Sequence, residues 1–274
     1  MNLGIIGCGN MATAILRGIV NSKIIENLNI VIYDIIYQKS KELSALHQNI
    51  KSTQNIKELF NSSEFILLAV KPQNFNDLFK TCAQYLDKTH ILISIAAGIS
   101  INKIQNLISA NSHKKLDLQI CRIMPNLPSF IFKGLSGIYF SKNFNQDYAE
   151  QIKKIFSAIG KIIILETEEK INDITAISGS GPAYLYYFIE CFIAAAKNLG
   201  FDETAAKELV YATISGAFEY LEKSEQSPKE LRRCVTSPGG TTEAAINHLQ
   251  SQNFENIISA AILKARDRAK ELGK

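Results

Sequence analysis

The sequence has 274 residues, of which 46% are hydrophobic and 20% are charged, with a formal net charge of +4. This length allows one or two domains with a sizeable core, and the composition is that of an ordinary globular protein. The lysines are scattered and the net charge is mild, so nothing favours a nucleic-acid partner.

The cysteines, the histidines and the longest apolar run exclude further classes. The five cysteines are irregularly spaced and predict no disulfide framework, and the four histidines show no metal-ligand spacing. We therefore expect no metal site. The longest apolar run, residues 91–97, is far shorter than the roughly 20 residues of a membrane span. We expect a cytoplasmic protein without a membrane partner.

An apolar run at residues 3–6 leads directly into the motif G-C-G-N-M-A at residues 7–12, and a helical stretch follows. A strand, the pattern G-x-G-x-x-A and a helix form the dinucleotide-binding fingerprint. Gly7 permits a tight turn, Gly9 lets the main chain approach a pyrophosphate, and Ala12 lets the helix pack closely. Amides of the first helical turn would face the phosphates. The alternative is a purely structural strand-to-helix turn.

Residues 30–33 predict a second strand, which is fully apolar, as strands buried on both faces are. This strand ends at Asp34. An acidic residue about 20 residues beyond the glycine motif is where such sites hydrogen-bond a ribose. Two interpretations stay open for Asp34, a ribose ligand and an ordinary loop aspartate.

Strand-like and helical segments alternate as far as residue 165, which predicts a doubly wound, mostly parallel sheet. The turns at 69–73, 94–98 and 124–128 each follow a strand, and such turns line the ligand crevice of an open α/β sheet. The predicted further strands are near 50 and at 65–70, 90–95, 119–124, 135–140 and 162–165, and the predicted helices are at 39–47, 56–60, 74–86 and 146–158.

Strand-like runs disappear after residue 165, and long helical patterns replace them. We therefore expect a dinucleotide-binding domain at residues 1–165 and an all-helical domain at residues 166–274. The helix predicted at 183–199 is almost uniformly apolar, which predicts burial within its own domain and against a partner subunit. The predicted helices are 183–199, 202–223, 227–235, 241–250 and 254–272, with Asp202 as an N-cap and Gly200 as a stop.

The stretch at residues 237–242, Ser-Pro-Gly-Gly-Thr-Thr, lies between two of these helices. Two adjacent glycines before a helix expose several amides in a small concavity, which suits an anion such as a carboxylate. Ser237, Thr241 and Thr242 add hydroxyl groups. A carboxylate cradle is predicted here, and a plain connecting loop is the alternative.

The chain resembles the pyrroline-5-carboxylate reductase family over essentially its whole length. The resemblance rests on four motifs in order, at residues 7–12, 69–73, 178–184 and 235–242, and on Met-Pro-Asn at 124–126. It implies a Rossmann-type sheet domain followed by an all-helical dimerisation domain. It also implies NAD(P)H-dependent reduction of 1-pyrroline-5-carboxylate to L-proline, the last step of proline biosynthesis, by a homodimer that assembles into a larger ring such as a decamer.

The resemblance also implies the site residues. Thr242 matches a threonine that hydrogen-bonds the ring nitrogen, and it is the candidate catalytic residue. The implied substrate-binding residues are Glu225, Ser237, Gly239, Gly240, Thr241 and Thr242. The residues expected to contact NADPH or NADH are Gly7, Cys8, Gly9, Asn10, Met11, Asp34, Asn55, Ala69, Val70, Lys71, Pro72, Ala97 and Asn126.

The chain departs from the family pattern at three places. Leu127 stands where threonine is frequent, and residues 232–233 are Arg-Arg where Lys-Asp is common. Asp34 stands where many members carry small or basic residues that accept a 2′-phosphate. The choice between NADPH and NADH is therefore open.

Two other functions compete with this interpretation. A 3-hydroxyacid dehydrogenase-like oxidoreductase would carry a lysine in the helix after the glycine-rich turn, with an asparagine one turn further on. Here Lys197 lies at the far end of that helix and Asn198 is adjacent to it, which argues against this class. A non-catalytic nucleotide-binding sensor would not require the second, carboxylate-binding stretch at residues 237–242.

Overall fold

The computed structural model describes residues 1–112 and 116–272. The chain forms two compact units, one made of Met1–Ser180 and the chain from Ala265 onward, the other of Gly181–Lys264. None of the helices described in these ranges has both the length and the apolar character needed to cross a membrane.

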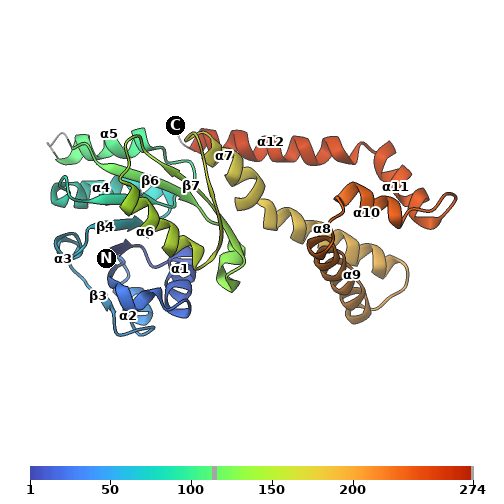
Figure 1. The fold of residues 1–274 in the computed structure, drawn as a ribbon, viewed down its shortest axis with the longest axis horizontal. Coiled ribbons are helices and arrows are strands. Elements are labelled where there is room, and N and C mark those ends of the chain that lie inside the picture. Colours follow the sequence, from blue (N-terminus) through green and yellow to red (C-terminus); the bar gives the residue numbers. More distant parts are fainter. Residues whose placement is uncertain (113–115, 273–274) are drawn as a thin grey trace. The chain divides into compact units, whose positions relative to one another are not determined.

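The first unit is built on one eight-stranded sheet in the order β3-β2-β1-β4-β5-β6-β7-β8 (Figure 1). Neighbouring strands run parallel except β6 and β7, which are antiparallel. The predicted doubly wound, mostly parallel sheet is confirmed. The strands are β1 (Asn2–Ile6), β2 (Asn29–Tyr33), β3 (Ile50–Ser52), β4 (Phe65–Leu68), β5 (Ile91–Ser94), β6 (Gln119–Met124), β7 (Gly134–Phe140) and β8 (Gly160–Ile164).

Successive side chains along each strand point to opposite faces of the sheet, and each face has its own hydrophobic core. Phe65 and Leu67 of β4 join one core, whereas Ile66 and Leu68 join the other. Helices α1 and α6 cover the first face, and α3, α4 and α5 cover the second. The helices of this unit are α1 (Asn10–Asn21), α2 (Tyr37–Ser44), α3 (Ile56–Ser62), α4 (Phe75–Cys82), α5 (Ile101–Ser112), α6 (Gln146–Ser157) and α7 (Lys170–Ile174).

The first unit continues beyond residue 165. Helix α7 and the π-helical turn Thr175–Gly179 follow β8, and neither was expected from the sequence. Ile174 packs so closely on β7 that a Cβ added at Gly137 would lie 2.9 Å from it. The end of α12 (Phe254–Leu272) also belongs to this unit, where Leu272 lies against Gly98.

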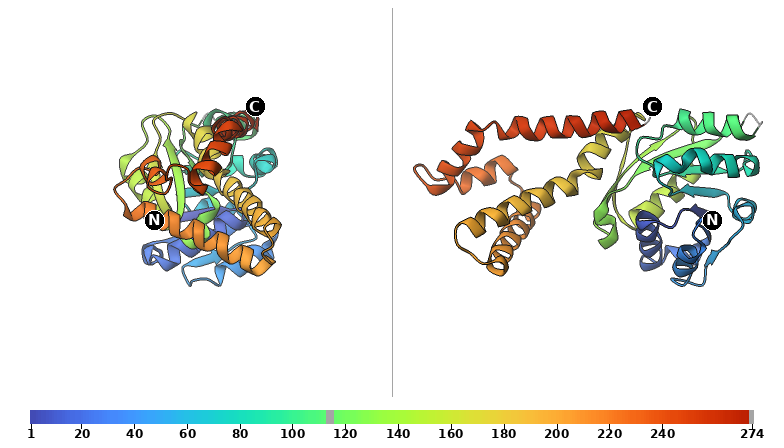
Figure 2. Two further views of the ribbon diagram at one scale, coloured as in Figure 1. Left: turned by 90° about the vertical axis from the view of Figure 1, so that its right-hand side faces the viewer. Right: turned by 180° about the vertical axis from the view of Figure 1, so that it is seen from behind.

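The second unit is helical, as expected. Its helices are α8 (Gly181–Asn198), α9 (Glu203–Lys223), α10 (Pro228–Cys234), α11 (Thr241–Ser251) and the first part of α12. Helices α8 and α9 form a hairpin, seen from further sides in Figure 2. The predicted N-cap is confirmed, because Asp202 accepts the Ala205 N–H at 2.8 Å. Gly200 follows α8 with φ +97°, which confirms the predicted stop.

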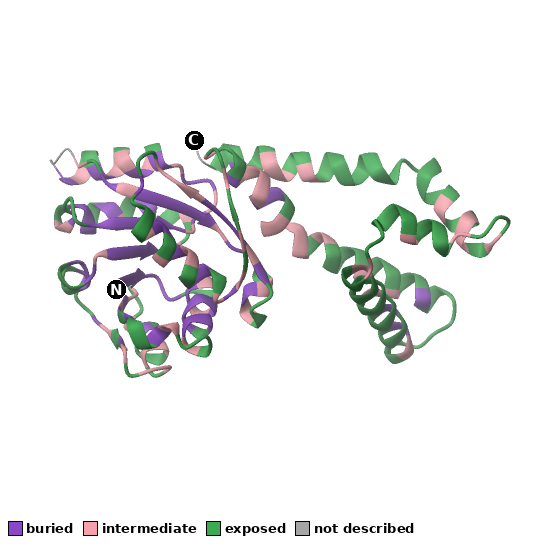
Figure 3. Cartoon of the chain, viewed as in Figure 1, coloured by how far each residue is buried: buried purple, intermediate pink, exposed green. Residues whose placement is uncertain are grey.

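The expected burial of the apolar helix within its own domain is wrong. Ala196 is the one buried residue among the described positions of α8. Leu185 and Tyr187 are 63% and 68% exposed, and Figure 3 shows the second unit as largely exposed. The physical reason is that, among the described elements, α9 is the one with which α8 packs extensively, and a single neighbouring helix covers only one side of an apolar helix.

Candidate functional site

The carboxyl ends of β1, β2 and β4 meet at Gly7. The Gly7 N–H donates to the Tyr33 carbonyl and the Ala69 N–H donates to the Ile6 carbonyl, both at 2.8 Å. Gly7 has φ +97°, and a Cβ there would lie 2.8 Å from the Ala69 carbonyl oxygen. Both the left-handed backbone and the close approach require glycine. The tight turn predicted from the motif is therefore present.

The turn opens toward solvent at Gly9 and the start of α1. Gly9 is the N-cap of α1, and no side chain caps this helix. A Cβ added at Gly9 would meet no atom within 4 Å, whereas Ala12 is buried against the sheet. Uncapped first-turn amides beside an open glycine are the donor set that binds a pyrophosphate. These residues fit a dinucleotide.

The sheet order places this turn at a topological switch point. β1 and β4 are neighbours, the crossover after β1 leads to β2 on one side and the crossover after β4 leads to β5 on the other, and ligands of open α/β sheets bind at such points. Ala69 and Val70 follow β4 and are half-buried, and Lys71 is exposed beside Pro72, the first residue of a short 3₁₀ turn. Ala97 follows β5 and is half-buried. These predicted cofactor residues lie after strands adjacent to β1 or β4.

Two predicted cofactor residues already have structural hydrogen bonds. Asn126 donates to the Ser178 hydroxyl at 3.0 Å and accepts the Leu135 N–H at 2.9 Å, so it fixes the turn after β6. Asn55 is the N-cap of α3 and accepts the Lys57 N–H at 3.0 Å. Both amides retain spare acceptor capacity, but neither is a free side chain.

Asp34 points toward the glycine turn. Its Oδ2 accepts the Cys8 N–H at 2.7 Å and its Oδ1 accepts the Ile36 N–H at 2.8 Å. The N-cap of α2 is Ile36, and no side chain caps that helix. Burial and then the Asp34 carboxylate raise the pKa of the Cys8 thiol to about 12, so this thiol is neutral at pH 7.

The predicted carboxylate cradle lies between α10 and α11. Gly239 adopts φ +73°, which favours glycine, and a Cβ at Gly240 would lie 2.7 Å from the Ser237 hydroxyl oxygen. Gly240 is the N-cap of α11, and no side chain caps that helix. The loop therefore precedes a helix N-terminus whose first amides are uncapped, at Thr241 and Thr242.

Two of the predicted cradle amides have partners within the chain. The Gly239 N–H donates to Glu243 Oε2 at 2.8 Å, and the Gly240 N–H donates to the Ser237 carbonyl at 3.0 Å. This loop therefore has the amides of Thr241 and Thr242 available for a ligand. The hydroxyls of Ser237, Thr241 and Thr242 are the other polar groups that it can contribute. Glu243 was not expected from the sequence, although an acid at the third position of a helix is a capping signal.

Glu225 lies in the exposed loop between α9 and α10. Within the described part of the chain no hydrogen bond joins it to the loop at residues 237–240. Thr242 is half-buried in the first turn of α11. Both residues belong to the second unit, and among the described residues no hydrogen bond joins their side chains.

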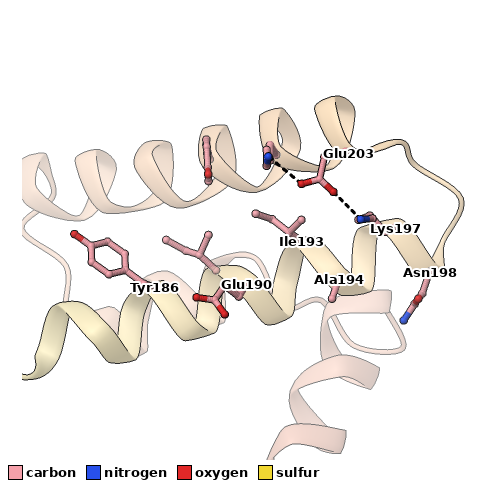
Figure 4. Close-up of a pocket in the computed structure, with 10 residues that line it drawn as sticks. Tyr186, Glu190, Ile193, Ala194, Lys197, Asn198 and Glu203 are labelled. Atoms are coloured by element: carbon pink, nitrogen blue, oxygen red, sulfur yellow. Dashed lines mark hydrogen bonds and ion pairs between the residues drawn. The ribbon is translucent and has the colours of Figure 1, made fainter.

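A groove of about 690 Å³ runs between α8 and α9 (Figure 4). Its wall is apolar at Tyr186 and Ile193, and one end carries the cluster in which Glu203 pairs with Lys197 at 2.6 Å and with Lys207 at 2.9 Å. An open, apolar groove between two helices suits a further helix better than a small polar ligand.

The chain is similar to known proteins over its full length. Residues 168–272 match the family model described as pyrroline-5-carboxylate reductase dimerisation, and residues 2–98 match the model described as NADP oxidoreductase, coenzyme F420-dependent. A pyrroline-5-carboxylate reductase of Staphylococcus saprophyticus is 32% identical over 272 residues, which are 99% of this chain and 98% of that protein.

Two solved structures agree with these matches. The pyrroline-5-carboxylate reductase of Coxiella burnetii has a TM-score of 0.87 and 32% identity, covering 100% of this chain and 98% of that one. The pyrroline carboxylate reductase of Plasmodium falciparum with NADP bound has a TM-score of 0.84 and 29% identity, with the same coverage. The fold, the two loops and the full-length matches agree, and the chain belongs to the pyrroline-5-carboxylate reductase family.

Proposed function

We propose that this chain reduces the C=N bond of 1-pyrroline-5-carboxylate with NAD(P)H to give L-proline, the last step of proline biosynthesis. The observation that carries the proposal is the presence, in one chain, of a dinucleotide turn at residues 7–12 and an uncapped carboxylate cradle at residues 237–242. The names of full-length relatives support the same activity.

The residues of the first unit hold the cofactor, which supplies the hydride when bound. Gly7 and Gly9 shape the turn, and the first amides of α1 bind the pyrophosphate. The turns after β4, β5 and β6 lie along the cofactor through Lys71, Ala97 and Asn126. This assignment explains why these turns follow strand ends at the switch point.

The residues of the cradle hold and orient the substrate. The amides of Thr241 and Thr242 and the Ser237 hydroxyl bind the substrate carboxylate. The Thr242 hydroxyl hydrogen-bonds the ring nitrogen, which is that of a protonated imine before hydride addition to the adjacent carbon and that of a secondary amine afterwards. A protonated cyclic imine already accepts a hydride well, so this site requires orientation rather than a strong general acid.

Residues 166–274 act as the dimerisation and substrate-binding part, and residues 1–165 as the cofactor-binding part. The match to a dimerisation family over residues 168–272 supports a homo-oligomer. The apolar groove between α8 and α9 is where a second copy packs, and dimers assemble further into a ring such as a decamer. All five cysteines are free thiols, which fits a reducing, cytoplasmic location. The proposal includes no nucleic-acid or membrane partner.

The direct test is turnover. Purified chain is mixed with NADH or NADPH, and 1-pyrroline-5-carboxylate is then added while cofactor oxidation and proline formation are measured. We expect oxidation only after the imine is added, with one proline formed for each cofactor oxidised. Reduction of NAD+ or NADP+ by a 3-hydroxyacid, or binding of cofactor without turnover of the imine, would favour the competing functions.

A further inference from the structure

The end of β2 carries a carboxylate whose direction is fixed by the backbone. Asp34 Oδ2 accepts the Cys8 N–H at 2.7 Å, and Oδ1 accepts the Ile36 N–H at 2.8 Å. Turning the side chain away would break both bonds. Asp34 therefore stays beside the glycine turn, where a dinucleotide places its adenosine ribose.

This carboxylate has acceptor capacity left for a ligand. An ionised carboxylate has about four lone-pair sites, and the two amides use two of them. The 2′- and 3′-hydroxyls of the ribose of NADH can donate to the remaining two. The 2′-phosphate of NADPH carries close to two negative charges and lacks the 2′-hydroxyl donor, so it meets Asp34 as a like charge.

The residues after Asp34 provide no compensating cation. They are Ile35 and Ile36, which are 84% and 51% exposed. The next cation along the chain is Lys39, in the first turn of α2, and its charge lowers the pKa of Cys8 against the larger effects of burial and Asp34. A phosphate at this position would meet a fixed carboxylate followed by two isoleucines, and the nearest cations along the chain are Lys39 and Lys41 of α2.

We propose that Asp34 makes this chain select NADH over NADPH, through the ribose hydroxyls and by repelling the 2′-phosphate. The inference rests on the proposed function and specifies which of its two possible cofactors, NADH or NADPH, the chain prefers. It separates this chain from the Plasmodium falciparum relative, whose structure holds NADP. Asp34 acts here as a specificity residue and takes no part in the chemical step.

Binding without substrate tests this inference independently of turnover. The dissociation constants of NADH and NADPH are measured by fluorescence titration of the full chain, for wild type, Asp34→Ser and Asp34→Asn. We expect wild type to bind NADH at least tenfold more tightly than NADPH. Both variants should lower that ratio at least tenfold, mainly because NADPH binds better, and adding Ile35→Arg to Asp34→Ser should favour NADPH further.

Two matched variants serve as controls. Asp77→Asn removes an exposed carboxylate of α4 that pairs with Lys80, and it should leave the ratio unchanged. Lys39→Gln should also leave the wild-type preference for NADH in place. Circular dichroism of each variant verifies folding, and Asp34→Asn keeps the shape of the side chain.

The outcomes separate the inference from the proposed function. Tighter binding of NADPH by wild type, or a ratio that survives both Asp34 substitutions, would overturn the inference while leaving imine reduction intact. NADH-selective binding that depends on Asp34, in a chain without imine turnover, would support the inference and reject the proposed function. Binding of neither nucleotide would overturn both.

Discussion

At the scale of single residues, the hydrogen bond of Glu243 indicates which chemical group the loop between α10 and α11 binds. Its carboxylate accepts the Gly239 N–H at 2.8 Å, directly before the N-terminus of α11. A carboxylate of the chain itself is thus held by an amide of the predicted cradle. The helix dipole and the uncapped amides of Thr241 and Thr242 act in the same direction. This supports the assignment of the loop to a substrate carboxylate.

Thr242→Val keeps the shape of the side chain and removes its hydroxyl. Because the proposed role of the hydroxyl is to orient the ring nitrogen, we expect kcat/KM to fall about tenfold or more, equivalent to roughly 1.4 kcal/mol. Steady-state kinetics with 1-pyrroline-5-carboxylate measure the change. Thr236→Val is the control, since the Thr236 hydroxyl is used within the chain on the Arg232 carbonyl. Equal kinetics for wild type and Thr242→Val would remove this residue from the mechanism.

Arg122 is a buried cation that depends on one partner. It is 3% exposed, its Nη1 lies 2.8 Å from Glu168 Oε1, and the Ile101 N–H donates to the same oxygen at 2.7 Å. Burial lowers the pKa of Arg122, and Glu168 opposes that effect. The pair ties the start of α7 to β6, and through it to the turn after β6 that carries Asn126.

Glu168→Ala leaves the buried guanidinium without its counter-charge. We expect a loss of about 2–4 kcal/mol in the free energy of unfolding, because an uncompensated buried charge is costly. Urea denaturation measures it. Asp77→Ala breaks an exposed pair with Lys80 and should cost less than about 1 kcal/mol. Equal losses for both variants would show that Arg122 finds another partner or is hydrated.

At the scale of elements, the α8–α9 hairpin carries a charge cluster that responds to pH. Glu203 opens α9 and pairs with Lys197, near the end of α8, and with Lys207. Hydrogen bonds from these lysines and their charges lower the pKa of Glu203 from 4.5 to about 2. Glu203 at the start of α9 and Lys197 near the end of α8 also interact favourably with the dipoles of these helices.

The depressed pKa of Glu203 sets the direction of a pH effect. The cluster contributes its stability fully above pH 4.5, and the contribution is lost as the pH falls toward 2. We expect Glu203→Gln to lower the melting temperature slightly at pH 7 and progressively less below pH 4.5. High salt should shrink the difference, since the cluster is exposed. Glu219→Gln, in the exposed pair with Lys223, is the control. A difference unchanged between pH 7 and pH 3 would contradict the ion-pair account.

The elements that the sequence predicts are those with a strong local signal. The apolar strands at β1, β2, β4 and β5 and the capped helix α9 were predicted, because burial on both faces and an Asp202 cap leave a clear pattern. Helix α5, helix α7 and the π-helical turn Thr175–Gly179 were missed. Helix α7 and the turn are short, and α7 is held by contacts with β6 and β7. Helix α5 spans 12 residues and buries Ile101, Ile104 and Ile108 at helical spacing, a signal that the sequence did offer.

The candidate site also contains features that the sequence predicts and features that it does not. Glycine at residue 7 was predictable, because a strand-to-helix turn with this motif demands a left-handed backbone. The direction of Asp34 was not, since a ribose ligand and a loop aspartate have the same sequence. The bonds to Cys8 and Ile36 fix this direction, and the role of Asp34 as a ribose ligand stays a proposal. The use of the Gly239 and Gly240 amides inside the cradle was also not predicted, although Glu243 at the third position of α11 is a capping signal.

At the scale of the whole molecule, the second unit is incomplete as a single copy. The side chains of Leu185, Tyr187 and Phe218 are more than half exposed, which is unusual for a folded monomer. Helix α8 was expected to be buried on most sides, and within one chain it is not. A partner copy over the groove beside α9, as proposed above, would account for its apolar composition.

A charge placed on this surface should prevent association. We expect wild type to form dimers or larger rings by light scattering coupled to size exclusion, and Leu185→Asp to dissociate them. The reason is that burying an unpaired carboxylate in an apolar interface is costly. Lys88→Asp changes an exposed loop of the first unit and should leave the mass unchanged. An active wild-type monomer would refute the account of this surface.

The central claim is that one chain brings a dinucleotide turn and a carboxylate cradle to the reduction of a cyclic imine. The most direct test is a single assay in which NADH oxidation and proline formation are followed together after 1-pyrroline-5-carboxylate is added to purified wild-type chain. The account predicts that both proceed at equal rates and that neither occurs without the imine. Absence of proline formation with either NADH or NADPH, in a folded and oligomeric preparation, would contradict it.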